Sequence, residues 1–188
     1  MKKWILLLMF LTTVKASAQN VEQDRFWSFS YLGHLGFQPG LRAGLEMPLI
    51  KPCPEKGLPD NNWIIRPQLG FFANPGDDRH IILNTEVGIK KPRKGKNSYR
   101  TFTFGLGYLN QSKLRSTSIN LGTGNTDSKQ RVSDHFLLPT INYEYGWATH
   151  KTTIWFSKLG LGRRLLGSNE DALMLFVELG IKLKTKKN

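Results

Sequence analysis

The residues of this chain that could do chemistry are four histidines, one cysteine and a set of regularly spaced charges. Ser157 is the serine that His34 or His150 could activate as a nucleophile. The other histidines are His80 and His135, and no Gly-x-Ser-x-Gly motif of the serine hydrolases occurs. A single histidine on a polar face is usually a hydrogen-bonded structural residue. We therefore expect no catalytic site, no metal site and no cofactor.

The charges form a sharper pattern, because eight of them fall on the polar face of segments that alternate apolar and polar residues. Successive side chains of a strand point to opposite faces, so residues two apart share a face. The eight are Arg42, Arg66, Lys158 and Lys182 together with Glu46, Glu86, Glu144 and Glu178. Four bases and four acids on one enclosed face can pair, which makes their burial tolerable. We predict a paired network that fixes strand register and fills a lumen; the alternative is an ion-conducting pathway.

Strands must position these charges, because no long stretch of the chain has helical periodicity. Eight segments alternate with period two. They span residues 27–37, 41–49, 63–71, 81–89, 101–108, 137–147, 152–163 and 173–183. An even number of strands suits an antiparallel up-and-down barrel, and closure removes the free sheet edges. The fold class predicted is therefore all-β, an eight-stranded antiparallel up-and-down transmembrane β-barrel.

Period two alone does not say which face points inward. A secreted lipocalin-like soluble barrel would also have eight strands, with its apolar face around a ligand. The polar face here is rich in glycine and its charges balance, as a narrow lumen filled by side chains requires. The apolar face carries aromatic residues near strand ends, which predicts girdles at two membrane interfaces. These are Trp27, Trp63, Trp147, Trp155, Tyr143 and Tyr145. The pattern favours the membrane arrangement.

The N-terminus has the pattern of a secretory signal peptide. Lys2 and Lys3 precede the apolar run 4–11, and Ala16-Ser17-Ala18 supplies a small-x-small cleavage site. An apolar run of this length is too short to span a bilayer as a helix. We predict a signal peptide over 1–18 and one outer-membrane β-barrel domain over 19–188, which locates the protein in the bacterial cell outer membrane.

Charge and cysteine content narrow the partners. The predicted signal carries three lysines and no acid, so the formal net charge falls from +13 to about +10 on cleavage. An exported basic protein rarely meets nucleic acid, so outer-membrane lipids and lipopolysaccharide phosphates are the expected counterions. Cys53 is the only cysteine, which excludes an internal disulfide.

The connecting segments predict an orientation. With both termini in the periplasm, the basic segment 90–96 and the lysines of 182–187 lie on the periplasmic side, where they could contact phospholipid head groups. Turns are predicted at 38–40, 50–61, 74–78, 92–98, 149–151 and 167–171. The polar stretch 111–134 is predicted to be a long loop on the opposite side, available to an extracellular partner.

The chain resembles the small bacterial outer-membrane β-barrel proteins of the OmpA/OmpX-like eight-stranded class. The resemblance covers nearly the whole mature chain, including the segments Phe104-Gly105-Leu106-Gly107-Tyr108 and Glu178-Leu179-Gly180-Ile181. Two features depart from it: the chain ends in Lys186-Lys187-Asn188 where such barrels often end on an aromatic residue, and segment 50–61 is long for a periplasmic turn.

The resemblance implies an architecture and no single activity. A non-enzymatic, monomeric barrel with a structural or surface-interaction role is the expectation. The alternatives are a small channel or a ligand-binding barrel. Some barrels of this class are lipid-modifying hydrolases or acyltransferases, but their His and Ser pattern is weak here.

Overall fold

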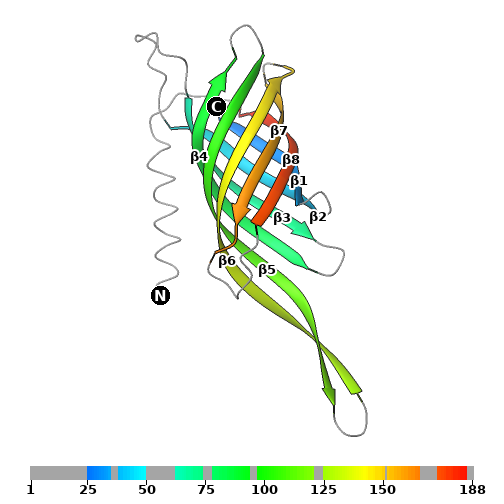
Figure 1. Cartoon of the computed structure of the whole chain (residues 1–188). Coiled ribbons are helices and arrows are strands. Elements are labelled where there is room, and N and C mark those ends of the chain that lie inside the picture. Colours follow the sequence, from blue (N-terminus) through cyan, green and yellow to red (C-terminus); the bar gives the residue numbers. More distant parts are fainter. Residues whose placement is uncertain are drawn as a thin grey trace.

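The computed structural model describes residues 25–34, 38–49, 62–73, 78–93, 97–120, 125–150, 152–165 and 173–185. It contains eight β-strands (Figure 1). They are β1 (Phe26–His34), β2 (Gln38–Pro48), β3 (Asn62–Ala73), β4 (Arg79–Pro92), β5 (Ser98–Asn120), β6 (Asn125–Ala148), β7 (Thr153–Arg163) and β8 (Leu173–Lys184). No helix among these residues is long and apolar enough to cross a membrane.

The strands form a closed barrel in which each strand pairs antiparallel with its neighbours in sequence. Closure joins the first strand to the last: Phe26 lies opposite Glu46 of β2 on one side and Lys184 of β8 on the other. The start of β1 and the end of β8 therefore share one end of the barrel, which we call the terminal end. This is the predicted eight-stranded up-and-down fold.

The two faces of the wall are opposite in character. Large apolar side chains cover the outside, and Leu41 at 71% and Phe104 at 59% exposed are examples. Polar residues next to them in sequence, such as Arg42 and Thr103, point inward and are buried. A lipocalin-like barrel would have the reverse arrangement. The alternation alone left open which face points inward, and the structure places the apolar face outward.

The predicted loop 111–134 is wrong, because most of it is strand. Residues up to Asn120 continue β5, and β6 begins at Asn125. Their pairing runs without interruption from Ser98 opposite Trp147 to Asn120 opposite Asn125. Serine, threonine and asparagine made this stretch look like a loop. A ribbon outside the barrel has no core to face, so it needs no apolar alternation, and backbone pairing alone orders it.

This ribbon projects beyond the barrel at the end opposite the terminal end (Figure 1). Pairing of β5 with β4 stops at Ser112, and pairing of β6 with β7 extends only to the bridge between Leu137 and Leu165. Residues 113–120 and 125–132 therefore pair only with each other. We call them the β5–β6 arm, and the end of the barrel that carries them the arm end.

Smaller differences concern the strand ends. The predicted turn 38–40 belongs to β2, where Pro39 lies opposite Gly33 and Gly40 opposite Leu32. Pro39 is the second residue of β2, next to the turn, where the missing backbone N–H of a proline is tolerated. The signal peptide 1–18, the turn 50–61 with Cys53, and the C-terminal lysines 186–187 lie outside the described residues.

Candidate functional site: the lumen charge network

All eight charges predicted for the polar face point into the lumen, and each is at most 6% exposed. They come from six strands, β2, β3, β4, β6, β7 and β8. We call this set the lumen charge network: Arg42, Glu46, Arg66, Glu86, Glu144, Lys158, Glu178 and Lys182.

Arg66 lies at the centre of the lumen charge network. Its guanidinium donates to three carboxylates: Glu46 at 2.5 Å, Glu144 at 2.6 Å and Glu86 at 3.4 Å. Only Glu86 is its direct cross-strand neighbour. Glu144 is on β6, which does not pair with β3. Arg66 therefore ties opposite walls of the barrel together.

Lys158 and Lys182 connect the carboxylates around Arg66 to further strands. Lys158 on β7 donates to Glu86 at 2.9 Å, across the lumen, and to Glu178 on the adjacent β8 at 2.8 Å. Lys182 on β8 contacts Glu46 at 2.6 Å and also Glu144. Each of these lysines thus joins two acids from different strands.

Arg42 completes an unbroken chain of ion pairs, because it contacts Glu178. Every carboxylate of the network has at least two cationic partners. A buried charge is costly when it stands alone and tolerable when it is paired and hydrogen-bonded. The arrangement therefore meets the condition under which so many charges can be enclosed.

Five further described residues hydrogen-bond to the network and were not assigned to it from the sequence: Lys90, Tyr99, Ser30, Asn84 and Thr103. Lys90 donates to Glu46 at 2.7 Å, although the sequence placed it in the basic segment 90–96 on the periplasmic side. The hydroxyl of Tyr99 donates to Glu144 at 2.9 Å, and that of Ser30 to Glu178 at 3.0 Å. Alternation along β4 and β5 was the available signal, since it puts Lys90 and Tyr99 on the inward face.

The arm-end half of the lumen is mainly apolar, although the polar residues His80 and Gln111 are also buried there. Eight inward side chains form a buried cluster there, which we call the apolar lumen cluster: Leu32, Phe72, Ile82, Leu109, Phe136, Leu138, Met174 and Phe176. Arg42 borders it, with its guanidinium carbon 5.7 Å from the ring centroid of Phe176. The lumen is thus charged toward the terminal end and mainly apolar toward the arm end, a division that the alternation of the sequence did not predict.

The tryptophans of the outer wall gather at one end. Trp27 begins β1, Trp63 begins β3, Trp155 begins β7 and Trp147 ends β6, so all four lie toward the terminal end. Each is between 40% and 47% exposed. Among the described residues, the tryptophans therefore form an aromatic girdle at the terminal end alone. They meet there because the strands run alternately up and down, so the starts of β1, β3 and β7 and the end of β6 lie at the same end of the barrel.

Two histidines, His80 and His135, make contacts that hold their rings in place. His80 is 1% exposed and stacks on Phe72, with ring centroids 4.3 Å apart and an interplanar angle of 6°. His135 is exposed on the outer wall, where its Nδ1 lies 2.5 Å from the Tyr108 hydroxyl and 3.0 Å from the Asn110 amide nitrogen. These contacts orient the two rings.

The serine and histidine pairing considered from the sequence is not assembled in the described part of the chain. His150 lies in the turn after β6, and Ser157 lies among outward residues of β7, opposite Tyr145. No hydrogen bond joins their side chains. The side chain of His34 lies outside the described residues. Nor does any group of three or more metal-ligating residues occur within the described ranges.

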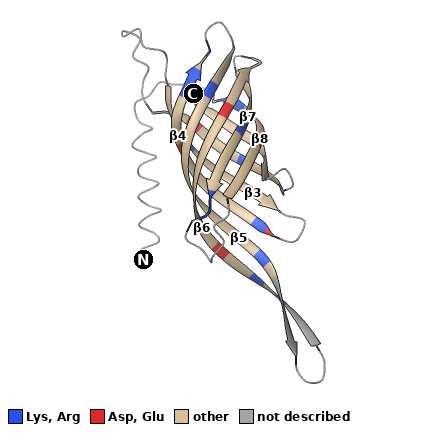
Figure 2. Cartoon of the chain, viewed as in Figure 1, with Lys and Arg blue, Asp and Glu red and all other residues tan. Residues whose placement is uncertain are grey.

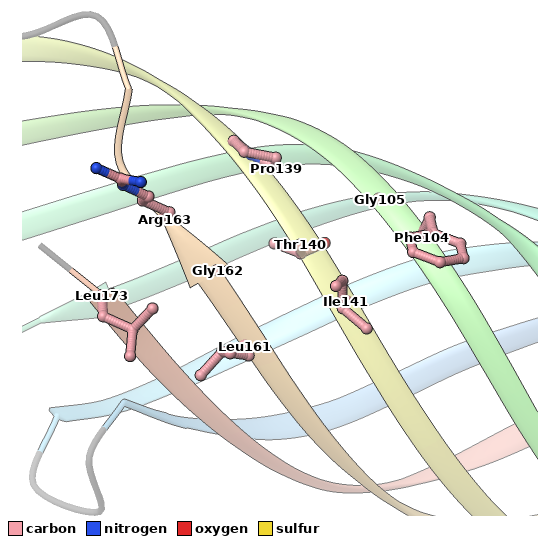
Figure 3. Close-up of a pocket in the computed structure, with 9 residues that line it drawn as sticks. All are labelled: Phe104, Gly105, Pro139, Thr140, Ile141, Leu161, Gly162, Arg163 and Leu173. Carbon is pink, nitrogen blue, oxygen red and sulfur yellow. The ribbon is translucent and has the colours of Figure 1, made fainter. Parts of the chain in front are cut away.

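Two shallow grooves lie in the apolar outer wall. One, of about 350 Å³, runs over β5, β6 and β7 between Phe104, Ile141 and Leu161 (Figure 3). The other, of about 510 Å³, lies over Ala43, whose small side chain leaves space between Phe29 and Leu69. Their walls match hydrocarbon chains better than a polar substrate.

No family model and no curated protein sequence matches the chain. Among solved structures, neisserial surface protein A is 10% identical, with a TM-score of 0.53 over 86% of this chain and 95% of that chain. A designed transmembrane β-barrel is 8% identical, with a TM-score of 0.51 over 89% of this chain and 99% of that chain. At such identities the similarity shows the fold, which is that of a small transmembrane β-barrel.

Proposed function

We propose that residues 19–188 form a monomeric β-barrel of the bacterial outer membrane, exported by a signal peptide over 1–18. The exposed apolar wall supports this, because water would not tolerate such a surface on every strand. The six shorter strands have 9 to 14 residues, enough for tilted strands to cross a bilayer. Closure leaves the wall without a free edge through which a second copy could pair.

With the termini in the periplasm, the arm end faces outward from the cell. The four tryptophans then lie at the periplasmic interface, where their rings suit the head-group region. The β5–β6 arm reaches out from the opposite side. It carries Lys113, Lys129 and Arg131 as described basic side chains, which suit the phosphates of lipopolysaccharide or an acidic extracellular partner.

The function that the geometry supports best is a closed, non-enzymatic barrel with a structural or surface-interaction role. The observation that carries it is the lumen charge network, in which eight buried charges from six strands pair with one another. Side chains that are already paired across a narrow lumen leave little room for an aqueous path. The apolar lumen cluster adds a second obstruction toward the arm end.

One observation favours the alternative, a small channel. Several inward polar atoms of the described residues have no hydrogen-bond partner, among them Gln68 Oε1, Asn84 Oδ1 and Thr101 Oγ1. Buried polar atoms of this kind are commonly satisfied by water. A hydrated region beside the network would be the starting point of a conducting path.

Conductance in planar bilayers distinguishes the two. The closed barrel gives no reproducible openings, whereas a channel gives steps of constant size. Fractionation of cells tests the location separately: recovery in detergent-extracted outer membrane agrees with the proposal, and recovery in the soluble periplasm contradicts it.

A further inference from the structure

Two cations face each other on the outer wall near the terminal end. Lys91 of β4 and Arg100 of β5 are direct cross-strand neighbours, and both side chains are exposed. Like charges in this position repel each other and weaken a sheet unless something neutralises them. Figure 2 shows the basic segments of β4 and the adjacent strand at this end of the barrel.

The described residues of the protein do not neutralise this pair. The preceding residue, Lys90, points inward and reaches Glu46, but Lys91 points outward. Within the described ranges, no carboxylate lies within ion-pair distance of Lys91 or Arg100. The inward and outward lysines of β4 therefore differ: Lys90 has an acid partner in the lumen, whereas Lys91 has none among the described residues and is exposed to an anion outside the barrel.

The surroundings of the pair indicate what that anion is. Arg100 lies opposite Tyr145, whose ring is 6.1 Å from that of Trp147. Two residues deeper on each strand, Ile89 lies opposite Phe102, and Phe102 opposite Tyr143. Aromatic rings thus lie on both sides of the two cations, with Phe102 and Tyr143 deeper in the wall and Trp147, opposite Ser98, nearer the terminal end. In a membrane this is the level of the lipid phosphates.

We propose that Lys91 and Arg100 together hold the phosphate of an anionic phospholipid in the adjacent leaflet. A guanidinium can donate two parallel hydrogen bonds to phosphate oxygens, and the ammonium supplies a second charge. Phosphatidylglycerol fits because its head group is anionic. A choline head group would bring a third cation to the pair. The inference rests on the proposed membrane location and adds a lipid class to it.

The test is native mass spectrometry of the full-length folded barrel, released from equimolar phosphatidylglycerol and phosphatidylcholine. Wild-type protein should retain one phosphatidylglycerol in preference. Lys91→Gln/Arg100→Gln should lose it, and Lys91→Arg should keep it. Arg79→Gln is the matched control, because Arg79 is an exposed cation on the same strand at the other end.

Equal retention of the two lipids by the wild type, or undiminished phosphatidylglycerol on the double variant, would overturn the inference. Displacement of the lipid by inorganic phosphate at the same concentration would also overturn it, since the site would then hold free phosphate. Insertion of each variant into vesicles is measured in parallel. Failure of the wild type to insert contradicts the membrane proposal itself, whereas insertion without lipid preference contradicts only the site.

Discussion

Arg66 Nη1 lies 2.6 Å from Glu144 Oε2, although their strands, β3 and β6, are not neighbours in the barrel. Glu144 has a lysine directly opposite it on β7, Lys158, and makes no ion pair with it. Lys158 instead contacts Glu86 and Glu178. The closed shape of the barrel thus adds ion pairs across the lumen to direct cross-strand pairs such as Lys158 with Glu178.

Removing the central cation should destabilise the barrel strongly. Arg66→Met leaves Glu46, Glu86 and Glu144 without their shared partner, and breaking a buried ion pair in this way costs about 3–5 kcal/mol. The variant should lose the heat resistance of the folded band on gels and unfold at lower urea concentration. Arg79→Gln, at an exposed position, should change stability by less than about 0.5 kcal/mol.

The double variant Arg66→Met/Glu144→Gln should regain part of the stability that Arg66→Met loses. One of the three carboxylates that lost their arginine partner is then replaced by a neutral amide. Recovery of about 0.5–3 kcal/mol relative to the sum of the single variants is the coupling expected for contacting residues. Single variants whose effects simply add would show that Arg66 and Glu144 do not interact. Unchanged heat resistance of Glu86→Ala or Glu144→Ala would likewise remove support for the network.

Gly146 should not tolerate a methyl group. A Cβ at this position would lie 2.2 Å from the ring of Tyr99, the residue whose hydroxyl donates to Glu144. Gly146→Ala should therefore push the ring out of the lumen wall and cost about 1–3 kcal/mol by overpacking. Gly33→Ala is the control, since its nearest contact would be an ordinary 3.6 Å. Urea unfolding in detergent micelles compares them, and equal stability would contradict the contact.

The apolar lumen cluster and the charge network should obstruct the lumen independently. Phe176→Ala removes a buried ring and should cost about 3–5 kcal/mol. Planar bilayers should nevertheless stay non-conducting, because the charges fill the other half of the lumen. Openings in Phe176→Ala that are absent from the wild type would assign the closure to the ring alone.

The β5–β6 arm should be dispensable for folding. Ser112 lies opposite Ser133, so Asn-Gly in place of residues 113–132 would close the hairpin with a two-residue turn. Heat resistance should be kept, since the removed residues pair only with each other. A lost folded band would show that the arm supports the barrel.

Protease treatment of intact cells tests the orientation of the arm. Its basic residues, such as Lys113 and Arg131, are trypsin sites on the side proposed to face outward. Cleavage should occur in intact cells and should leave the barrel resistant. Cleavage only after permeabilisation would place the arm in the periplasm.

The sequence alone was sufficient for the architecture and for much of the lumen. Period-two alternation is a local property of each strand. It places Arg66 on the polar face of β3 and Glu86 on the polar face of β4, whichever strands these later pair with. Direct neighbours such as Lys158 and Glu178 follow from consecutive strands pairing in hairpins. The eight buried charges could therefore be named before their contacts were known.

Three features depend on tertiary structure. The pairs that cross the lumen, such as Arg66 with Glu144, require strands far apart in sequence to face each other at the same height, and closure and stagger set that height. The assignment of Lys90 to the lumen depends on how far β4 continues. The arm has no apolar alternation, because neither of its faces meets a core, so only its backbone pairing identifies it as a strand. Local pattern decided which way each side chain points, and the closed barrel decided which side chains meet.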